Sequence, residues 1–177
     1  MDPGTEAPQG GSAAVDGASP RGKDEDRLRA ERTERRRAWF RHHWQHEVAF
    51  NQLCGLRIIR WDPDGVEAVL PYADRLTAHE GILHGGVVAA LIDTIGTGAV
   101  IAGHDYDNGS RTMTVSMTVN YLSIARRQDL IAVARTTKRG RLVNFAEVEV
   151  RGAGTGKPVA HGVLTVVVHG ERPGMPD

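Results

Sequence analysis

The chain has 177 residues, which is enough for one domain with a substantial hydrophobic core. Its 22 lysine and arginine residues balance 22 aspartate and glutamate residues, so the overall charge does not predict a nucleic-acid or acidic partner. The only cysteine, Cys54, excludes an intramolecular disulfide and fits a reducing compartment. The first residues also lack the basic-then-apolar order of a signal peptide, so we expect a cytoplasmic protein.

The N-terminal part divides into two segments of different composition. Residues 1–23 are mostly Gly, Pro, Ala, Ser and acidic residues, which predicts a disordered tail. Residues 24–54 are rich in helix formers and contain no Pro or Gly, which predicts an N-terminal helical extension. Within it, Phe40, Trp44 and Val48 recur at four-residue steps and would form a stripe that packs on the rest of the protein.

Strand signals lie on both sides of a central apolar segment. Two short apolar runs, 56–61 and 66–70, flank the turn sequence Asp62-Pro63-Asp64-Gly65 and predict a hairpin. Four further strands are expected in meander order at 112–122, 130–137, 142–151 and 159–169. In the first of these, the odd-numbered residues from Met113 to Tyr121 are apolar or aromatic and alternate with polar residues from Thr114 to Asn120.

The longest apolar segment, 85–103, is interrupted by one carboxylate, Asp93. It is long enough to raise the question of a membrane span, but Asp93, the glycines and the flanking strands favour a buried core helix without membrane insertion. A helix that is apolar nearly all round must be enclosed, and a curved antiparallel sheet of five or six strands is available to enclose it.

Helical spacing places Asp93 on a face of small residues, which leaves space for a ligand or for close packing. That face comprises Gly86, Ala89, Ala90, Asp93, Gly96 and Thr97, while Val87, Val88, Leu91, Ile92 and Ile95 would face the sheet. The carboxylate is either functional or a buried group satisfied by nearby donors, and the spacing alone leaves both readings open.

One motif resembles a known family. The run Gly81-Ile82-Leu83-His84-Gly85-Gly86, followed by Leu91-Ile92-Asp93, resembles the PaaI-type hotdog-fold acyl-CoA thioesterases. The likeness continues through VNYLSIA (119–125), the Arg139-Gly140-Arg141 turn and GKPVAHGVLTVVV (156–168). It implies an α+β hotdog fold over residues 55–170, with a curved antiparallel sheet around a central helix. Residues 171–177 are then expected to be a C-terminal tail, and the N-terminal helix is an addition.

The resemblance also implies roles for residues in a thioester hydrolase. The Gly85 N–H would bind the thioester carbonyl oxygen as it becomes an oxyanion. Asp93 of the opposite subunit would activate water or act as the nucleophile. His84 would fix the loop geometry or hydrogen-bond near the carbonyl, and the Thr114 hydroxyl would help to hold the water. The residues expected to contact substrate are Gly86, His79, Asn120, Arg139 and Arg141, the two arginines as ligands of the CoA phosphates.

The same resemblance predicts a homodimer with sheets joined edge to edge, and a dimer of dimers as a further assembly. Acyl-CoA is the expected substrate, and no metal or redox cofactor is expected.

One departure from the family pattern is visible: many relatives carry Asn six residues before the motif histidine, where this chain has Ala78. The side chain of the neighbouring residue His79 could take the place of this Asn side chain. This departure and the extra helix motivate an alternative, a non-catalytic acyl-CoA-binding module whose N-terminal helix engages a partner; a hotdog dehydratase fits the motif less well.

Other candidate sites have weaker signals. Cys54 lacks a Cys–His signature and is expected to be a plain core thiol rather than a nucleophile. His42, His43 and His46 could bind a metal, although a solvated helix face is the ordinary reading of such a cluster. The run Arg35-Arg36-Arg37 is short and lies among acidic residues, so it does not predict nucleic-acid binding.

Overall fold

The computed structural model describes residues 20–177. The predicted tail therefore lies outside the described residues, apart from 20–23, which are helical. The elements in chain order are α1 (Pro20–His46), α2 (Ala49–Cys54), β1 (Arg57–Asp62), β2 (Gly65–Leu70), a 3-10 turn (Asp74–Leu76), β3 (Thr77–His79), β4 (Ile82–Leu83), α3 (Gly85–Ala102), a 3-10 turn (Tyr106–Asn108), β5 (Arg111–Tyr121), β6 (Leu130–Lys138), β7 (Val143–Gly152) and β8 (Pro158–His169).

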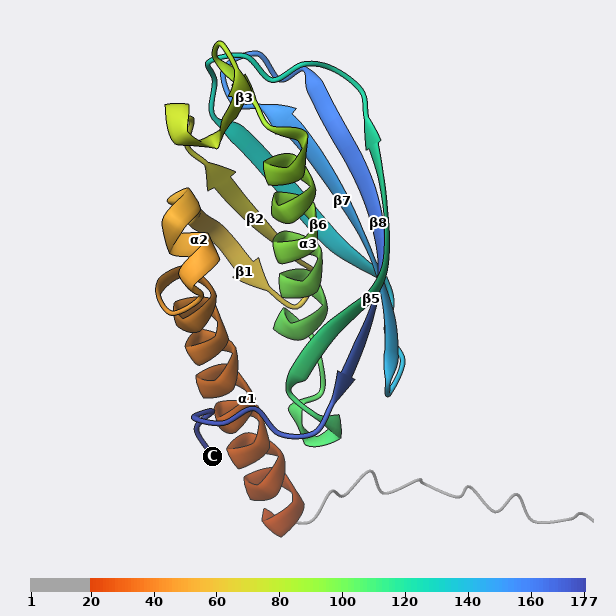
Figure 1. Ribbon diagram of the computed structural model, residues 1–177. Helices are drawn as coiled ribbons and strands as arrows, with labels where there is room; N and C mark the ends of the chain where they lie inside the picture. The colour runs from red at the N-terminus through yellow and green to blue at the C-terminus, as the bar shows by residue number, and fades with distance from the viewer. Residues whose placement is uncertain (1–19) are drawn as a thin grey trace, which may run out of the picture.

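A six-stranded antiparallel sheet wraps around α3, as Figure 1 shows. Its strand order is β1-β2-β6-β7-β8-β5, which confirms the predicted hotdog architecture. The expected four-strand meander is wrong, because β5 pairs with β8 and not with β6. A tight hairpin connects strands through a few residues, whereas the connection 122–129 is long enough to cross to the strand next to β2. This topology leaves β5 as an edge strand beside α3.

The core lies between α3 and the concave face of the sheet. Ile92, Ile95 and Ile101 are fully buried there. By length and composition alone α3 could span a membrane, but 61% of that stretch is buried within the fold. The helical register is only partly as predicted, because the sheet wraps most closely around the second half of the helix. Gly96 therefore faces Val148 and Leu164 of the sheet, and not a cleft.

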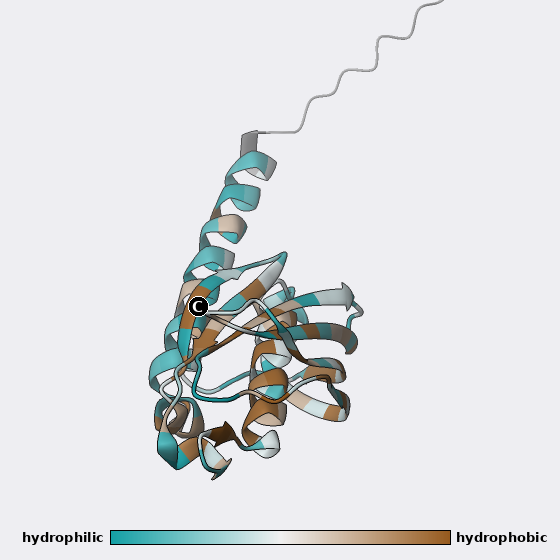
Figure 2. Cartoon of the chain, turned by 90° about the horizontal axis from the view of Figure 1, so that it is seen from above, coloured by the Kyte–Doolittle hydropathy of each residue, from teal (hydrophilic) through white to brown (hydrophobic). Residues whose placement is uncertain are grey.

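The helical extension consists of two helices, because α1 ends at His46 and α2 begins at Ala49. The predicted stripe is confirmed for Phe40 and Trp44, which are buried against the domain. The Trp44 indole Nε1 donates a 3.0 Å hydrogen bond to the Thr94 carbonyl, which ties α1 to the middle of α3. Figure 2 shows that the first half of α1 is hydrophilic and extends beyond the sheet.

The C-terminal residues run back along α1, as Figure 1 shows. They form no helix or strand, but hydrogen bonds hold them to α1 and to the residue before β5. The Arg36 Nε donates to the Pro176 carbonyl at 3.0 Å, and the Arg172 amide donates to the Ser110 hydroxyl at 2.7 Å. The predicted C-terminal tail, 171–177, therefore has a fixed path that passes from the start of β5 to α1.

Candidate active site

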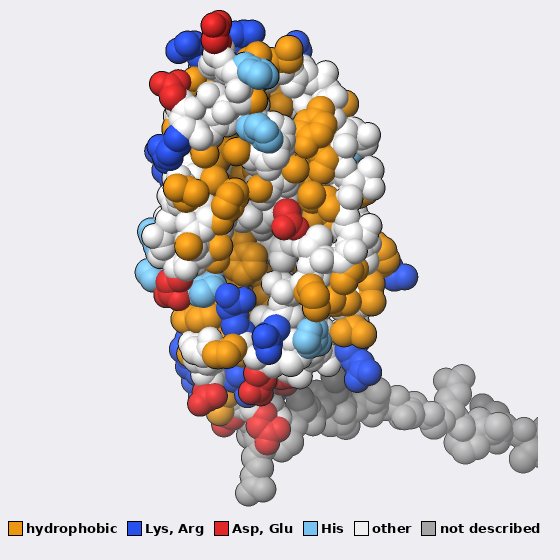
Figure 3. All heavy atoms as spheres, viewed as in Figure 1, with side chains coloured by type: hydrophobic (Ala, Val, Ile, Leu, Met, Phe, Trp, Pro, Cys, Tyr) orange, Lys and Arg blue, Asp and Glu red, His pale blue; other side chains and the backbone are white. Residues whose placement is uncertain are grey.

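Asp93 is half-buried on the part of α3 that the sheet leaves uncovered. Figure 3 shows one acidic side chain in the middle of this face, among hydrophobic and uncharged side chains, while the other acidic side chains lie toward the edges of the view. The Thr114 Oγ1 donates a 2.7 Å hydrogen bond to Asp93 Oδ1. The Thr97 Oγ1 lies 3.1 Å from Thr114 Oγ1. The Thr114 hydroxyl has one proton and gives it to Asp93, so in the other bond Thr97 is the donor and Thr114 is the acceptor. One carboxylate oxygen is thus oriented, and no other donor from residues 20–177 reaches the carboxylate.

A cavity of about 390 Å³ opens beside this carboxylate. The core domain contributes Asp93, Thr94, Thr97, Thr112 and Thr114 to its wall. The remaining wall comes from Trp44, Val48 and Asn51 of the helical extension and from Arg172 of the C-terminal segment. The cavity therefore combines a carboxylate, several hydroxyls, an aromatic wall and one cation.

The start of α3 lies about two helical turns from Asp93. His84 is the N-cap residue, and its Nδ1 accepts a 2.8 Å hydrogen bond from the Gly86 amide. The amide of Gly85, the first residue of α3, has no acceptor within the helix and points out at its positive end. The Gly86 amide already donates to His84, so the Gly85 amide is the one of the two without an acceptor among residues 20–177.

Tyr121 contacts this helix start and was not predicted as a site residue. Its hydroxyl donates a 2.9 Å hydrogen bond to the Gly85 carbonyl. Its ring would lie 3.5 Å from a Cβ atom added at Gly85. Tyr121 therefore fixes the peptide next to the free amide, and its ring packs directly against position 85.

A β-bulge in β5 explains why Tyr121 was missed. Thr114 pairs with Val166 and Ser116 with Thr165, so Val115 is an extra residue in β5. An extra residue reverses the alternation of side chains along a strand. Thr114 before the bulge and Tyr121 after it therefore face α3 together, although their odd spacing places them on opposite faces of a regular strand.

The same bulge corrects the prediction for Asn120. This residue follows Ser116 and Thr118 onto the outer face of the sheet, and it lies opposite His161 of β8. Asn120 is thus on the other side of the sheet from Asp93 and Gly85. It does not belong to the candidate site of its own protomer.

The predicted anion ligand Arg139 has a different role in the structure. Its guanidinium donates to the Val100 carbonyl at 2.8 Å and to the Pro63 carbonyl at 2.6 Å. A third contact, of 3.2 Å, goes to the Ala99 carbonyl. Arg139 therefore caps the C-terminal end of α3, the opposite end from Gly85, and three hydrogen bonds hold its guanidinium there. Arg141 is exposed in the same turn.

The remaining predicted residues lie at the edges of the site. His79 and Ala78 are exposed in β3, on the hairpin that leads to His84.

Cys54 is buried, and burial raises the pKa of its thiol, which fits a core residue. His43 Nδ1 lies 2.7 Å from Glu47 Oε2. In the part of the chain that the structure describes, no three His, Cys, Asp or Glu residues converge on a metal-binding geometry.

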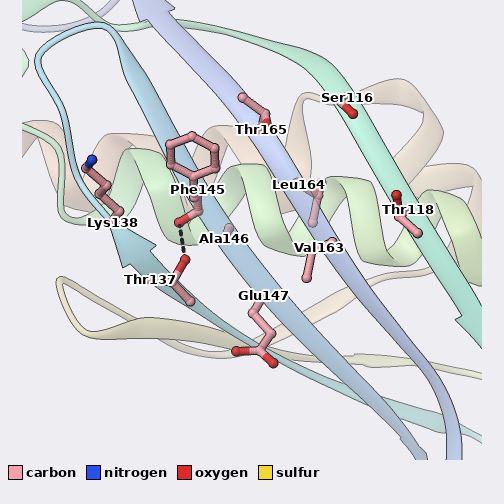
Figure 4. Close-up of a pocket in the computed structure, with 10 residues that line it drawn as sticks. All are labelled: Ser116, Thr118, Thr137, Lys138, Phe145, Ala146, Glu147, Val163, Leu164 and Thr165. Atoms are coloured by element: carbon pink, nitrogen blue, oxygen red, sulfur yellow. Dashed lines mark hydrogen bonds between the residues drawn. The ribbon is translucent and has the colours of Figure 1, made fainter.

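A second hollow, of about 410 Å³, lies on the outer face of the sheet. Figure 4 shows Ser116 and Thr118 of β5 on one side of it, with Phe145 and Val163 nearby and α3 behind the strands. None of the predicted site residues lines this hollow. The cavity beside Asp93 is therefore the candidate active site.

Comparison with known proteins identifies the family. The model of the thioesterase superfamily matches residues 80–159, which include His84, Gly85, Asp93 and Thr114. Human acyl-coenzyme A thioesterase 13 is 34% identical over 115 residues, which are 64% of this chain and 80% of the relative. The mouse protein of the same name is 30% identical over 101 residues, which are 56% of this chain and 70% of the relative.

Solved structures agree with this assignment. Zebra fish thioesterase superfamily member 2 superposes with a TM-score of 0.63 at 25% identity, covering 72% of this chain and 91% of that one. A mutant thioesterase from Pseudomonas aeruginosa gives a TM-score of 0.64 at 26% identity, covering 71% of this chain and 88% of that one. The chain belongs to the thioesterase superfamily and is a hotdog-fold thioester hydrolase.

Proposed function

We propose that the protein hydrolyses acyl-CoA thioesters, with Asp93 as the group that acts on water or on the carbonyl carbon. The observation that carries this proposal is the oriented carboxylate: Thr114 holds Asp93 Oδ1 at 2.7 Å in a cavity, in a family of thioester hydrolases. The similarity to human acyl-coenzyme A thioesterase 13 supports CoA as the thiol. No metal or redox cofactor is required for this chemistry.

The proposed reaction adds water across the thioester bond. The Gly85 N–H donates to the carbonyl oxygen, and the positive end of α3 stabilises the negative charge that develops there. Asp93, as general base, takes a proton from water while the water oxygen bonds to the carbonyl carbon. The C–S bond then breaks, the carboxylic acid forms, and the CoA sulfur receives the proton. Direct attack by the Asp93 carboxylate is the other route: the C–S bond breaks, CoA leaves as the thiolate and takes up a proton, and water then cleaves the mixed anhydride to the acid and the free Asp93 carboxylate.

A second copy of the chain would complete the site. Within one protomer Gly85 and Asp93 are about 12 Å apart along the helix axis, from eight residues at 1.5 Å rise. The edge strand β5 carries the exposed apolar residues Met113 and Val115, 53% and 54% accessible, which suit pairing with another chain. A two-fold axis across this edge would reverse the direction of the partner's α3. Gly85 of one protomer would then approach Asp93 of the partner subunit, and we propose this homodimer as the active form.

The test is thiol release from a panel of short, medium, long and aryl acyl-CoAs, measured with wild type and Asp93→Asn together. We expect release from at least one class and its loss in the variant. Absence of release from every class overturns the proposal. Recovery of intact acyl-CoA from a tight complex would instead support the alternative, a binding module without turnover. Sedimentation equilibrium of the same samples tests the dimer.

A further inference from the structure

The wall of the Asp93 cavity includes segments outside the region that the thioesterase model matches. That region is 80–159, whereas Trp44, Val48 and Asn51 precede it and Arg172 follows it. These four residues therefore belong to the helical extension and the C-terminal segment, outside the matched region, and they form part of the cavity wall beside Asp93.

Arg172 is held in place at both ends. Its backbone amide donates to Ser110 Oγ at 2.7 Å, and Ser110 is completely buried. Its Nη2 lies 2.6 Å from His43 Nε2, and His43 Nδ1 lies 2.7 Å from Glu47 Oε2. Because guanidinium only donates, His43 Nε2 accepts from Arg172 and the Nδ1–H is directed to Glu47. The His43 ring also stacks on Trp39, with ring centroids 4.9 Å apart, which fixes its orientation.

The guanidinium shares the cavity with Asp93 but does not pair with it. No ion pair within 4.0 Å joins the two groups, and among residues 20–177 the carboxylate takes its hydrogen bond from Thr114 alone. Arg172 uses one of its five N–H donors for His43, so several remain for a ligand. A guanidinium with free donors in a partly enclosed site matches the planar geometry of a carboxylate.

We propose that Arg172 determines acyl specificity by binding a carboxylate at the far end of a short acyl chain. This inference rests on the proposed function, and it names the substrate class as CoA thioesters of dicarboxylic acids. Trp44 limits the length of the chain, because its indole lines the cavity and is fixed by its bond to the Thr94 carbonyl. The Arg172 guanidinium would pair with the terminal carboxylate, which an apolar acyl group lacks.

The test compares two substrates of equal chain length, glutaryl-CoA and pentanoyl-CoA, which differ in a terminal carboxylate. We expect wild type to have the higher kcat/KM for glutaryl-CoA. Arg172→Gln should lower that value about tenfold or more, since a charge-assisted bidentate contact is lost, and should lower the value for pentanoyl-CoA by much less. Most of the loss should appear in KM, and Arg172→Lys should restore part of it. Arg111→Gln, which removes an exposed cation near Arg172, is the matched control and should not alter the ratio.

Equilibrium binding separates this inference from the proposed function. The probes are two CoA thioethers that cannot be hydrolysed, S-(4-carboxybutyl)-CoA and S-pentyl-CoA. Preference for the carboxylate probe that Arg172→Gln abolishes supports the inference even if no thioester is turned over. Equal binding of both probes, an equal loss of both in Arg172→Gln, or the same loss in Arg111→Gln overturns it, whether or not hydrolysis is observed.

Discussion

The Thr114 hydroxyl donates a 2.7 Å hydrogen bond to the Asp93 carboxylate, joining the edge strand to the central helix at the candidate site. The bond fixes one carboxylate oxygen and leaves the other without a hydrogen-bond donor among residues 20–177. Thr114 itself accepts from Thr97, which is buried, so the orientation of the carboxylate is anchored in the core. In the proposed reaction Thr114 is therefore a positioning residue, and Asp93 is the group that meets the substrate.

Asp93→Asn should abolish most of the thioesterase activity. The amide keeps the size of the side chain but cannot accept a proton from water, and general-base catalysis contributes about 10²- to 10⁴-fold. We expect kcat to fall by that factor while the melting temperature stays close to that of wild type. Asp64→Asn, in the exposed β1–β2 turn, is a matched control that should retain full activity. Activity of Asp93→Asn equal to wild type would show that the carboxylate is only structural.

Thr114→Val should reduce kcat without unfolding the protein. Valine keeps the shape of threonine but removes the donor, and a hydrogen bond to a charged group is worth about 1.5–3 kcal/mol. We expect a decrease of about tenfold or more in kcat, because the carboxylate loses the hydrogen bond that orients it. Thr114→Ser should restore most of the activity. Ser116→Ala lies beyond the bulge on the outer face and should be neutral; equal losses in both variants would contradict the assignment.

The central helix and its motif could be predicted because their signals are local. The apolar run and the His84-Gly85-Gly86 start define α3 almost to the residue, and the cap at His84 follows from neighbouring atoms. The same holds for Asp93 as the single carboxylate in that run. These features depend on residues that are neighbours in the sequence, and the structure has the helix and its start where the sequence predicts them.

The bulge in β5 and the cap at Arg139 depend on distant partners. Nothing in the alternation around Val115 marks an extra residue, because the bulge exists only relative to Val166 and Thr165 of β8. Sequence reasoning therefore placed Asn120 in the site and left Tyr121 out. The family resemblance and the fork geometry of its guanidinium predict that Arg139 binds CoA phosphates, whereas the carbonyls that it binds in the structure come from the end of α3 and from Pro63.

Arg139→Gln should lower stability and leave the site intact. The guanidinium satisfies three backbone carbonyls, two of them at the C-terminal end of α3, where a cation is also favoured by the helix dipole. We expect the free energy of unfolding to fall by about 1–3 kcal/mol in urea titrations. Arg141→Gln in the same turn should change it by less than about 0.5 kcal/mol. A loss of CoA affinity in Arg139→Gln at unchanged stability would restore the role predicted from sequence.

His104 should make the protein less stable as the pH falls. Its side chain is 5% accessible, and its Nε2 has no hydrogen-bond partner among the described residues. Burial holds the pKa of this imidazole below its ordinary value of 6.5, with Arg139 acting in the same direction and Asp105 opposing it. Below pH 6.5 the unfolded chain takes up a proton that the folded protein does not, so the free energy of unfolding decreases until the pH reaches the folded-state pKa.

The measurement is urea unfolding from pH 7.5 down to pH 5 for wild type and His104→Gln. Wild type should lose up to about 1.4 kcal/mol per pH unit from this group below pH 6.5, and the variant should lack that part of the slope. At pH 7.5, a full unit above 6.5, the imidazole is largely neutral in both states, so the difference between the two proteins there mainly reports packing. His79→Gln, an exposed histidine in β3, should keep the wild-type slope. Parallel curves for wild type and His104→Gln would mean that His104 is not the group that couples folding to pH.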